Sequence, residues 1–144
     1  MITIPETFNV ATYFVDRNIL EGRGSNVAIE CGGAQISYRQ LQERTNRVGN
    51  VLQQFGVRIE ERVAILLPDT PEFLYSFFAA IKIGAVAVPL NTYLRADDYE
   101  YFLNDTRAPV LLAHHSLLPT LDLVPADRLR YLQRVVVVGG QDSR

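Results

Sequence analysis

The sequence predicts an α/β fold in which a parallel sheet is built from alternating strands and helices. Short, continuous apolar runs occur at residues 63–67, 85–88 and 110–113, and apolar residues on both faces are typical of buried parallel strands. A strongly apolar helix at residues 73–83 joins the first two runs, and such crossovers are almost always right-handed links between parallel strands. The stretch at residues 134–139, which contains four consecutive valines, predicts another buried strand. The expected order is therefore βαβαβ, preceded by an N-terminal helix and a short hairpin.

The composition indicates an ordinary globular domain and argues against several other classes. Hydrophobic residues make up 48% of the 144 residues and charged residues 21%, a balance that disfavours disorder. The formal net charge is -2, so we expect neither a nucleic-acid partner nor an anionic membrane partner. The N-terminal residues resemble neither a signal peptide nor a membrane span, and the single cysteine can form no internal disulfide. These features predict a cytoplasmic protein.

The first element expected along the chain is a short helix. Asn9 is placed to cap it, and the glycine-containing stretch at residues 22–26 ends it. Val10, Tyr13 and Phe14 are expected to share one face of this helix, with Leu20 farther along. The stretch at residues 22–26 follows a helix and leads into a strand, the reverse of a phosphate-binding loop, so we interpret it as a helix end.

A hairpin and an amphipathic helix are expected next. Residues 27–30 and 35–37, joined by two glycines, predict a short hairpin that lies beside the main sheet. Ser37 and Gln40 then match a capping box at the start of a helix, and Gly56 stands where a helix ends. The apolar face of this helix is expected to comprise Leu41, Thr45, Val48, Leu52 and Phe55.

The helix at residues 73–83 is the most apolar element of the chain. Thr70 is placed to cap it and Glu72 lies in its first turn, where the helix dipole favours a negative charge. Only Ser76 and Lys82 interrupt its apolar surface, so most of its circumference should be covered. Gly84 can supply the left-handed residue that ends the helix before the next strand.

A shorter helix is predicted at residues 96–104. Asp97 and Asp98 occupy its first turn, where they suit the helix dipole. Neighbouring residues on a helix do not face each other, so we interpret this pair as helix-start charge rather than as a general acid and base. The inward face is expected to comprise Tyr99, Phe102 and Leu103.

A histidine pair and a single cysteine are two further candidate sites. His114 and His115 follow a strand, where adjacent side chains are expected to point apart, so they are interpreted as solvated loop residues rather than as a metal pair. Cys31 has no neighbouring histidine to activate it and is interpreted as a packing residue. We therefore expect no catalytic residue and no metal ligand within this chain.

Several motifs resemble the adenylate-forming acyl-CoA synthetases. The sequence ISYRQL at residues 36–41 is similar to their first core motif, and AIKIGAVAVPLN at residues 80–91 is similar to the second. Residues 9–18 and 97–101 further resemble the benzoate-coenzyme A ligase branch of the family. The similarity extends over nearly the whole chain, and the segments occur in the order expected for the family.

The resemblance implies an ATP-dependent ligase that joins benzoate or a related aromatic carboxylate to AMP and then to coenzyme A. ATP, Mg2+ and coenzyme A are the cofactors implied for the full-length parent. The phosphate-binding loop, the aryl pocket and the catalytic lysine belong to later parts of the family pattern. Residues 1–144 are therefore expected to be the N-terminal portion of the AMP-binding domain, truncated before the phosphate-binding loop, inactive alone and inclined to self-association through surface meant for the missing portion.

One loop carries a functional hypothesis. Residues 91–95 follow a strand, and the loops after parallel strands are where α/β folds bind ligands. Related aryl-CoA ligases can place a basic residue here against coenzyme A; this chain has Tyr93 at the matching position and Arg95 nearby. The resemblance thus suggests Arg95 at a coenzyme A entrance. The alternative is a stand-alone α/β interaction module without catalysis.

Overall fold

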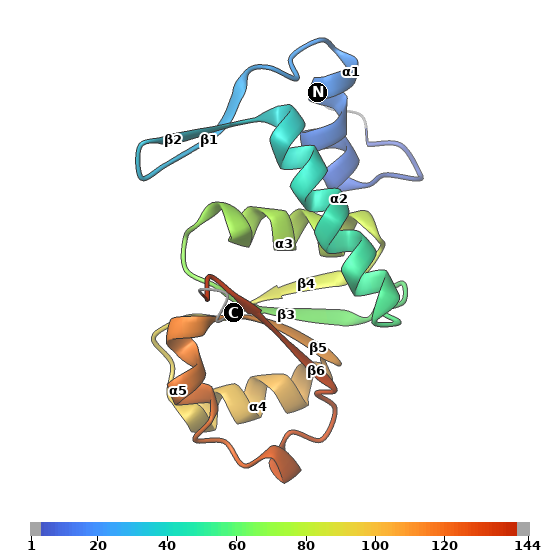
Figure 1. Ribbon diagram of the computed structural model, residues 1–144. Coiled ribbons are helices and arrows are strands. Elements are labelled where there is room, and N and C mark those ends of the chain that lie inside the picture. The colour runs from blue at the N-terminus through green and yellow to red at the C-terminus, as the bar shows by residue number, and fades with distance from the viewer. Residues whose placement is uncertain (1–3, 141–144) are drawn as a thin grey trace.

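The computed structural model describes residues 4–140, and its centre is a four-stranded parallel sheet (Figure 1). The strands are β3 (Arg62–Leu66), β4 (Val86–Pro89), β5 (Val110–His114) and β6 (Arg134–Val138). They lie side by side in the order β4-β3-β5-β6, and every neighbouring pair is parallel. The predicted α/β architecture is confirmed. The predicted domain spans residues 1–144, and its two ends, residues 1–3 and 141–144, lie outside the described part of the chain.

One face of the sheet is covered by α3 (Pro71–Lys82), and α2 (Tyr38–Gln54) crosses over α3 on the side away from the strands (Figure 1). Every residue of α3 except Glu72 is at least partly buried, as expected for a helix between two layers. The core on this side is formed mainly by Leu52, Val57, Val63, Ile65, Leu67, Ala79, Ala80, Ala85, Val110 and Leu112. Small side chains let the two helices approach closely, because a side chain on Gly49 would press on Ile83.

The capping predictions for these two helices had different outcomes. The capping box of α2 is confirmed, because Ser37 Oγ accepts from the Gln40 amide and Gln40 Oε1 accepts from the Ser37 amide. The predicted side-chain cap by Thr70 is wrong within the described residues: its backbone carbonyl, not its hydroxyl, accepts from the Phe73 amide. Gly84 adopts the left-handed conformation that was predicted after α3, with φ of 82°.

The opposite face of the sheet is covered by α4 (Ala96–Thr106) and the short α5 (Leu118–Leu121). Tyr99 and Leu103 are fully buried, as predicted, whereas Phe102 is 37% exposed and does not belong to the inward face. The predictions that β4 and β6 are buried are also wrong, because neither edge strand contains a buried residue. Val86 of β4 is 44% exposed, and Val135 and Val137 of β6 are 41% and 51% exposed. The helices on this side cover the centre of the sheet and leave the outer face of its edge strand open.

The N-terminal helix forms as predicted, but the apolar face expected from the residue spacing is not the buried one. Asn9 Oδ1 accepts from the amides of Ala11 and Thr12, which confirms the cap. A π-helical stretch, η1 (Thr12–Asp16), follows and runs into α1 (Arg17–Leu20). The buried residues are Ala11 and Val15, whereas Val10, Phe14 and Leu20 are exposed. A π-helical turn contains more residues than an α-helical turn, so the α-helical spacing that predicted a shared face does not apply here.

Polar contacts attach this N-terminal segment to the helical layers. Asp16 Oδ1 accepts from Lys82 Nζ at 2.7 Å and from Gln42 Nε2 at 2.8 Å. Asn9 Nδ2 donates to the Ile81 carbonyl at 2.8 Å. Lys82, which interrupts the apolar sequence of α3, therefore serves as the partner of a half-buried carboxylate.

The hairpin β1 (Val27–Cys31) and β2 (Ala34–Ser37) forms a separate antiparallel sheet. The hairpin itself was predicted, but its position beside the main sheet was not correct. It lies beyond α3 from the main sheet, next to the start of α2 (Figure 1). The reason is that β2 leads directly into α2 through the capping box, and α2 belongs to the outer layer. Within the described residues, no helix is long and apolar enough to cross a membrane.

Candidate functional site

The strand order identifies the carboxyl edge of the sheet as the place where a ligand would bind. Along the chain β3 is followed by β4 on one side, and β5 then returns to the other side of β3. The crossover helices lie on opposite faces of the sheet, α3 on one and α4 on the other (Figure 1). Such a reversal leaves a crevice beyond the carboxyl ends of the strands, which is the common ligand position in open α/β sheets. Here the reversal point lies between the ends of β3 and β5.

A cavity of about 450 Å³ opens at the same edge, beyond β3 and β4. Its wall combines apolar side chains with a few polar groups: Leu67, Pro68, Asp69, Phe73, Pro89, Leu90, Asn91, Thr92 and Tyr93. The Asn91 side chain accepts from the Tyr93 amide at 2.9 Å, which shapes the loop after β4. The wall therefore offers an acidic group and an amide but no cation.

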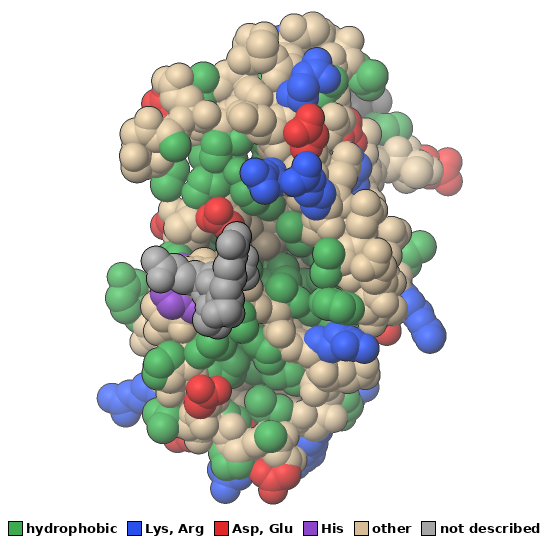
Figure 2. Space-filling model, in the orientation of Figure 1, with side chains coloured by type: hydrophobic (Ala, Val, Ile, Leu, Met, Phe, Trp, Pro, Cys, Tyr) green, Lys and Arg blue, Asp and Glu red, His purple; other side chains and the backbone are tan. Residues whose placement is uncertain are grey.

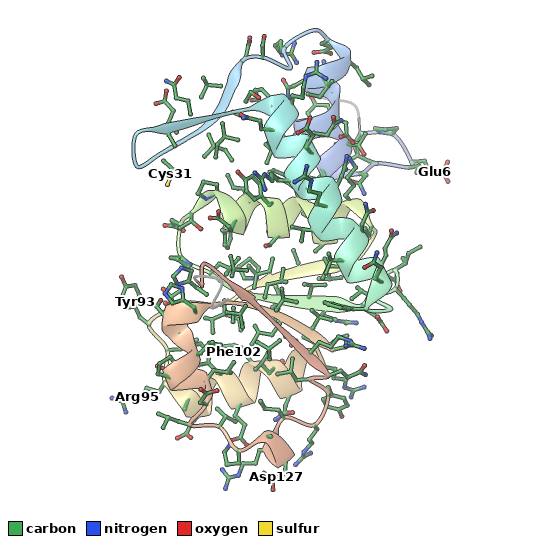
Figure 3. The ribbon with its side chains drawn as sticks, in the orientation of Figure 1. Glu6, Cys31, Tyr93, Arg95, Phe102 and Asp127 are labelled. Atoms are coloured by element: carbon green, nitrogen blue, oxygen red, sulfur yellow. The ribbon has the colours of Figure 1, made fainter. Side chains whose placement is uncertain are left out.

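The loop predicted to bind a ligand lies at this edge, and Figure 3 shows Tyr93 and Arg95 on the same side of the molecule. Tyr93 lines the cavity and is 93% exposed, whereas Arg95 is exposed outside the cavity wall, at the residue before α4. Asp98 Oδ2 accepts from the Arg95 amide at 3.0 Å. Asp98 thus supports the start of the helix, and Arg95 keeps its guanidinium in solvent.

Tyr99, in α4, holds this loop in place through a hydrogen bond. Its hydroxyl donates to the Asn91 carbonyl at 3.1 Å, and its ring is fully buried between α4 and the sheet. Burial raises the pKa of the Tyr99 phenol, and Asp98 adds to the effect. The neutral hydroxyl is therefore the form that holds the loop.

His114 and His115 lie at the reversal point, and the prediction that their side chains point apart is wrong. Their ring centroids are 4.4 Å apart at an interplanar angle of 47°, so the two side chains do not point apart. His114 ends β5, but His115 begins a 3-10 turn, η2 (His115–Leu117), and the alternation of a strand stops between them. His114 Nδ1 lies 2.8 Å from Ser116 Oγ. Ser116, a residue type favoured in turns, directly follows the pair and is the local signal that the strand ends here.

The remaining candidate residues lie elsewhere. Cys31 is half-buried at the end of β1, in the hairpin beyond α3 (Figure 3). Asp97 does lie in the first turn of α4 as expected. Among the described residues, no group of three or more His, Cys, Asp and Glu side chains is arranged to hold a metal ion.

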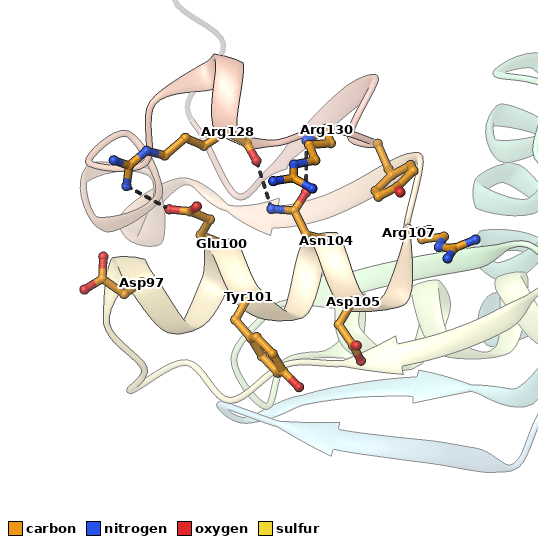
Figure 4. A pocket seen from close by; sticks show the side chains of 9 residues that line it. Asp97, Glu100, Tyr101, Asn104, Asp105, Arg107, Arg128 and Arg130 are labelled. Atoms are coloured by element: carbon orange, nitrogen blue, oxygen red, sulfur yellow. Dashed lines mark hydrogen bonds and ion pairs between the residues drawn. The ribbon is translucent and has the colours of Figure 1, made fainter.

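A larger pocket of about 670 Å³ lies on the outer side of α4 (Figure 4). Its contacts are structural. Asn104 Nδ2 donates to the Arg128 carbonyl at 2.8 Å, and Asn104 Oδ1 accepts from the Arg130 amide at 3.0 Å. Arg128 also pairs with Glu100 at 3.5 Å. These contacts fasten the segment before β6 to α4, so the carboxyl edge remains the better candidate for a ligand site.

Comparison with known proteins places this architecture in a family. The family model described as AMP-binding enzyme matches residues 16–142. The 4-hydroxybenzoate-CoA/benzoate-CoA ligase of Rhodopseudomonas palustris is 42% identical over 132 residues, which are 92% of this chain and 24% of that protein. The benzoate-CoA ligase of Thauera aromatica is 36% identical and aligns with 96% of this chain and 26% of its own length.

A solved structure is also closely similar. The anthranilate CoA ligase AuaEII, determined in complex with anthranoyl-AMP, superimposes with a TM-score of 0.89 at 38% identity. The match covers 94% of this chain and 26% of that one. The chain thus spans about a quarter of the length of the curated relatives it matches. By the family match and the shared fold, the chain belongs to the AMP-binding enzyme family.

Proposed function

We propose that residues 1–144 are the N-terminal portion of the AMP-binding domain of an ATP-dependent aryl-CoA ligase, truncated before the phosphate-binding loop. The reaction would join benzoate or a related aromatic carboxylate to coenzyme A and release AMP and pyrophosphate. The observation that carries the proposal is the 42% identity to a ligase named for benzoate and 4-hydroxybenzoate. The likeness to an anthranilate CoA ligase supports the same aromatic class.

Within that enzyme, these residues would act as a framework rather than as the reacting centre. Displacement at phosphorus requires cationic groups and hydrogen-bond donors arranged around the phosphates. The cavity at the carboxyl edge carries no lysine or arginine in its wall, and the described residues form no carboxylate cluster suited to Mg2+. The donor set therefore does not fit Mg2+ and ATP, and we expect the chain alone to be inactive.

Arg95 would contribute positive charge at the coenzyme A entrance of the full-length enzyme. Its side chain is exposed beside the carboxyl edge, next to the loop that Asn91 and Tyr99 hold in place. An exposed guanidinium suits the phosphates of a nucleotide, and such attraction weakens as salt rises. The proposal concerns binding of coenzyme A, not the chemistry of acyl transfer.

Kinetics of the full-length parent would test this role. Arg95→Ala should raise KM for coenzyme A and reduce its salt dependence while kcat for adenylate formation stays unchanged. Arg58→Ala is the matched control, because Arg58 is an exposed arginine in the turn before β3, at the opposite end of the strands. Equal coenzyme A kinetics in wild type and Arg95→Ala would refute the assignment.

The substrate class can be tested in the same enzyme. The complete reading frame that contains this chain should be expressed and supplied with ATP, Mg2+, coenzyme A and a panel of carboxylates. We expect the highest kcat/KM with benzoate or a ring-substituted benzoate. A preference for acetate or a long-chain fatty acid would overturn the aromatic assignment while leaving the family membership intact.

A further inference from the structure

A groove of about 580 Å³ lies on the N-terminal segment, away from the carboxyl edge of the sheet. Figure 1 shows this segment beside α2, with α3 between it and the strands. Asn9, in the wall of the groove, donates to the Ile81 carbonyl near the end of α3, whereas the carboxyl edge lies beyond the start of that helix. A ligand in this groove would therefore be bound independently of the carboxyl edge.

The wall of the groove is mainly apolar and contains two aromatic rings. Its apolar residues are Pro5, Phe8, Tyr13 and Leu20. The centroids of the Phe8 and Tyr13 rings are 5.4 Å apart at an interplanar angle of 52°, so the rings form an angled corner rather than a flat stack. Phe8 is 39% exposed and Leu20 is 85% exposed, which leaves apolar surface in contact with water. Covering this surface with the apolar part of a ligand would be favourable.

One cation lines the groove, and no carboxylate of the described residues lines it. The Arg17 guanidinium carbon lies 4.8 Å from the centroid of the Tyr13 ring, so the positive charge is directly beside the apolar corner. Arg17 pairs with Glu21 at 2.6 Å, but Glu21 also pairs with Arg23. Because two arginines share one carboxylate, the group retains a positive charge. An anionic group on an otherwise apolar ligand would complement this charge.

The backbone that forms this wall has an unusual conformation. Thr12 and Tyr13 belong to the π-helical stretch η1, and π-helical turns are rare in proteins and frequent at functional sites. Hydrogen bonds hold both ends of the stretch. Asn9 caps its start, and Asp16, its last residue, accepts from Lys82. The groove is therefore formed before any ligand arrives, as is usual for small-molecule sites.

We propose that this groove binds a small aromatic carboxylate. The rings of the ligand would pack against Phe8, Tyr13 and Leu20, and its carboxylate would pair with Arg17. The site is independent of the proposed ligase function, because it uses only residues 5–20 and requires neither ATP nor coenzyme A.

Titration of the 15N-labelled chain with 2-naphthoate, and in parallel with the neutral 2-naphthamide, tests the class of ligand. We expect saturable amide shifts centred on residues 7–20 with 2-naphthoate, and an affinity for 2-naphthamide that is lower by about threefold or more. Equal affinity for the two compounds, or no saturable shift, would overturn the proposal. Shifts centred on residues 67–69 and 89–93 would overturn it as well, because the ligand would then lie at the carboxyl edge.

Two arginine variants test whether the cation of the groove itself pairs with the ligand. Arg17→Gln should weaken the binding of 2-naphthoate by about three- to fivefold. Arg23→Gln is the matched control and should change the affinity by less than about twofold, because Arg23 pairs with the same Glu21 but lies outside the groove wall. Equal effects of the two variants would refute the role of Arg17.

A third variant tests the apolar part of the groove. Phe8→Ala should weaken the binding of both 2-naphthoate and 2-naphthamide, because it removes ring surface that both compounds would cover. Unchanged affinity for both would contradict the proposed position of the rings. Amide shifts outside residues 4–23 that match those of the wild type show that each variant is folded.

Discussion

The strands β5 and β6 are neighbours with similar sequences, yet they lie in different environments. β5 has the sequence VLLAH and its first four residues are buried, whereas β6 has the sequence RVVVV and none of its residues is buried. β5 lies between β3 and β6, under helices on both faces of the sheet. β6 packs one face on the core through Val136 and Val138, and the other face stays open. An apolar run therefore predicts a strand, but the neighbours of that strand decide its burial.

The open face of β6 has a consequence for the behaviour of the isolated chain. Figure 2 shows hydrophobic side chains gathered on the side of the molecule where β6 lies in front. An apolar strand at the edge of a sheet can pair with another chain. If the proposed function is correct, the remainder of the full-length enzyme would cover this surface. In the isolated chain, a second copy of the chain would cover it instead.

The largest effect on stability is expected at a pair of residues that lie opposite each other on β5 and β6. Leu111 of β5 and Val135 of β6 are register partners, but only Leu111 is fully buried. Leu111→Ala should lower the free energy of unfolding by about 2–5 kcal/mol through lost burial and a cavity. Val135→Ala should change it by less than about 0.5 kcal/mol. Chemical denaturation measures both, and equal losses would show that the strands are equally covered.

A smaller effect is expected in the helix that covers β5. Tyr99→Phe removes the hydrogen bond to the Asn91 carbonyl, so it should cost about 1 kcal/mol of unfolding free energy. Tyr101→Phe in the same helix is the control, because Tyr101 is exposed. No difference between the two variants in thermal or chemical unfolding would mean that the buried hydroxyl does not stabilise the loop.

The same residue predicts a pH dependence. Because the folded state raises the pKa of Tyr99 above its ordinary value of 10.0, folding favours the neutral phenol. The contribution of the neutral Tyr99 phenol to the free energy of unfolding is complete below pH 10.0, and it is lost as the pH rises through the higher pKa of the folded state. Wild type should therefore lose more stability than Tyr99→Phe above pH 10 in parallel denaturant titrations. Parallel pH profiles for the two proteins would contradict this assignment.

A modest gain in stability is expected from a substitution in α2, on the face of the sheet that α2 and α3 cover. The Thr45 hydroxyl is buried and has no hydrogen-bond partner among the described residues. Thr45→Val keeps the shape and removes the unpaired group, so it should be neutral or stabilise the fold by up to about 1 kcal/mol. Thr106→Val is a useful comparison, because the Thr106 hydroxyl donates to the Phe102 carbonyl. A clear loss in Thr45→Val, by denaturation, would indicate that this hydroxyl is hydrogen-bonded in solution.

A substitution on the open face of β6 is expected to change stability least. The same substitution should change self-association most clearly. Val137→Lys places a charge on the exposed edge strand, so the fold should tolerate it while self-association decreases. Sedimentation velocity over a range of concentrations measures the shift toward monomer. A wild-type chain that stays monomeric at high concentration would contradict the association itself.

Much of this fold could be predicted from local sequence signals. The capping box at Ser37 and the left-handed Gly84 depend only on residues close in the chain, and both are confirmed. The apolar runs similarly located all four strands. Two failures are local: Thr70 makes no side-chain cap within the described part of the chain, and a π-helical turn changes which residues of the N-terminal helix are buried. The exposure of Val137 has a longer-range cause, because it follows from strand order, which the sequence did not determine.

The candidate site was predicted less well than the fold. The loop of Tyr93 and Arg95 was located correctly at the carboxyl edge, because a loop after a parallel strand must lie there. The contact of His114 with His115 was missed because it depends on one change of backbone conformation between two adjacent residues. The reversal point could not be predicted either, because its position depends on the strand order. The part that a residue at this edge can play in ligand binding depends on which segments of the chain meet there.

One assay addresses the central claim that this chain is a framework without its own adenylation chemistry. Pyrophosphate release by the purified 144-residue chain should be measured with ATP, Mg2+ and benzoate, beside the full-length parent under the same conditions. We predict release by the parent and none above background by the chain alone. Sustained, benzoate-dependent turnover by the chain alone would contradict the account.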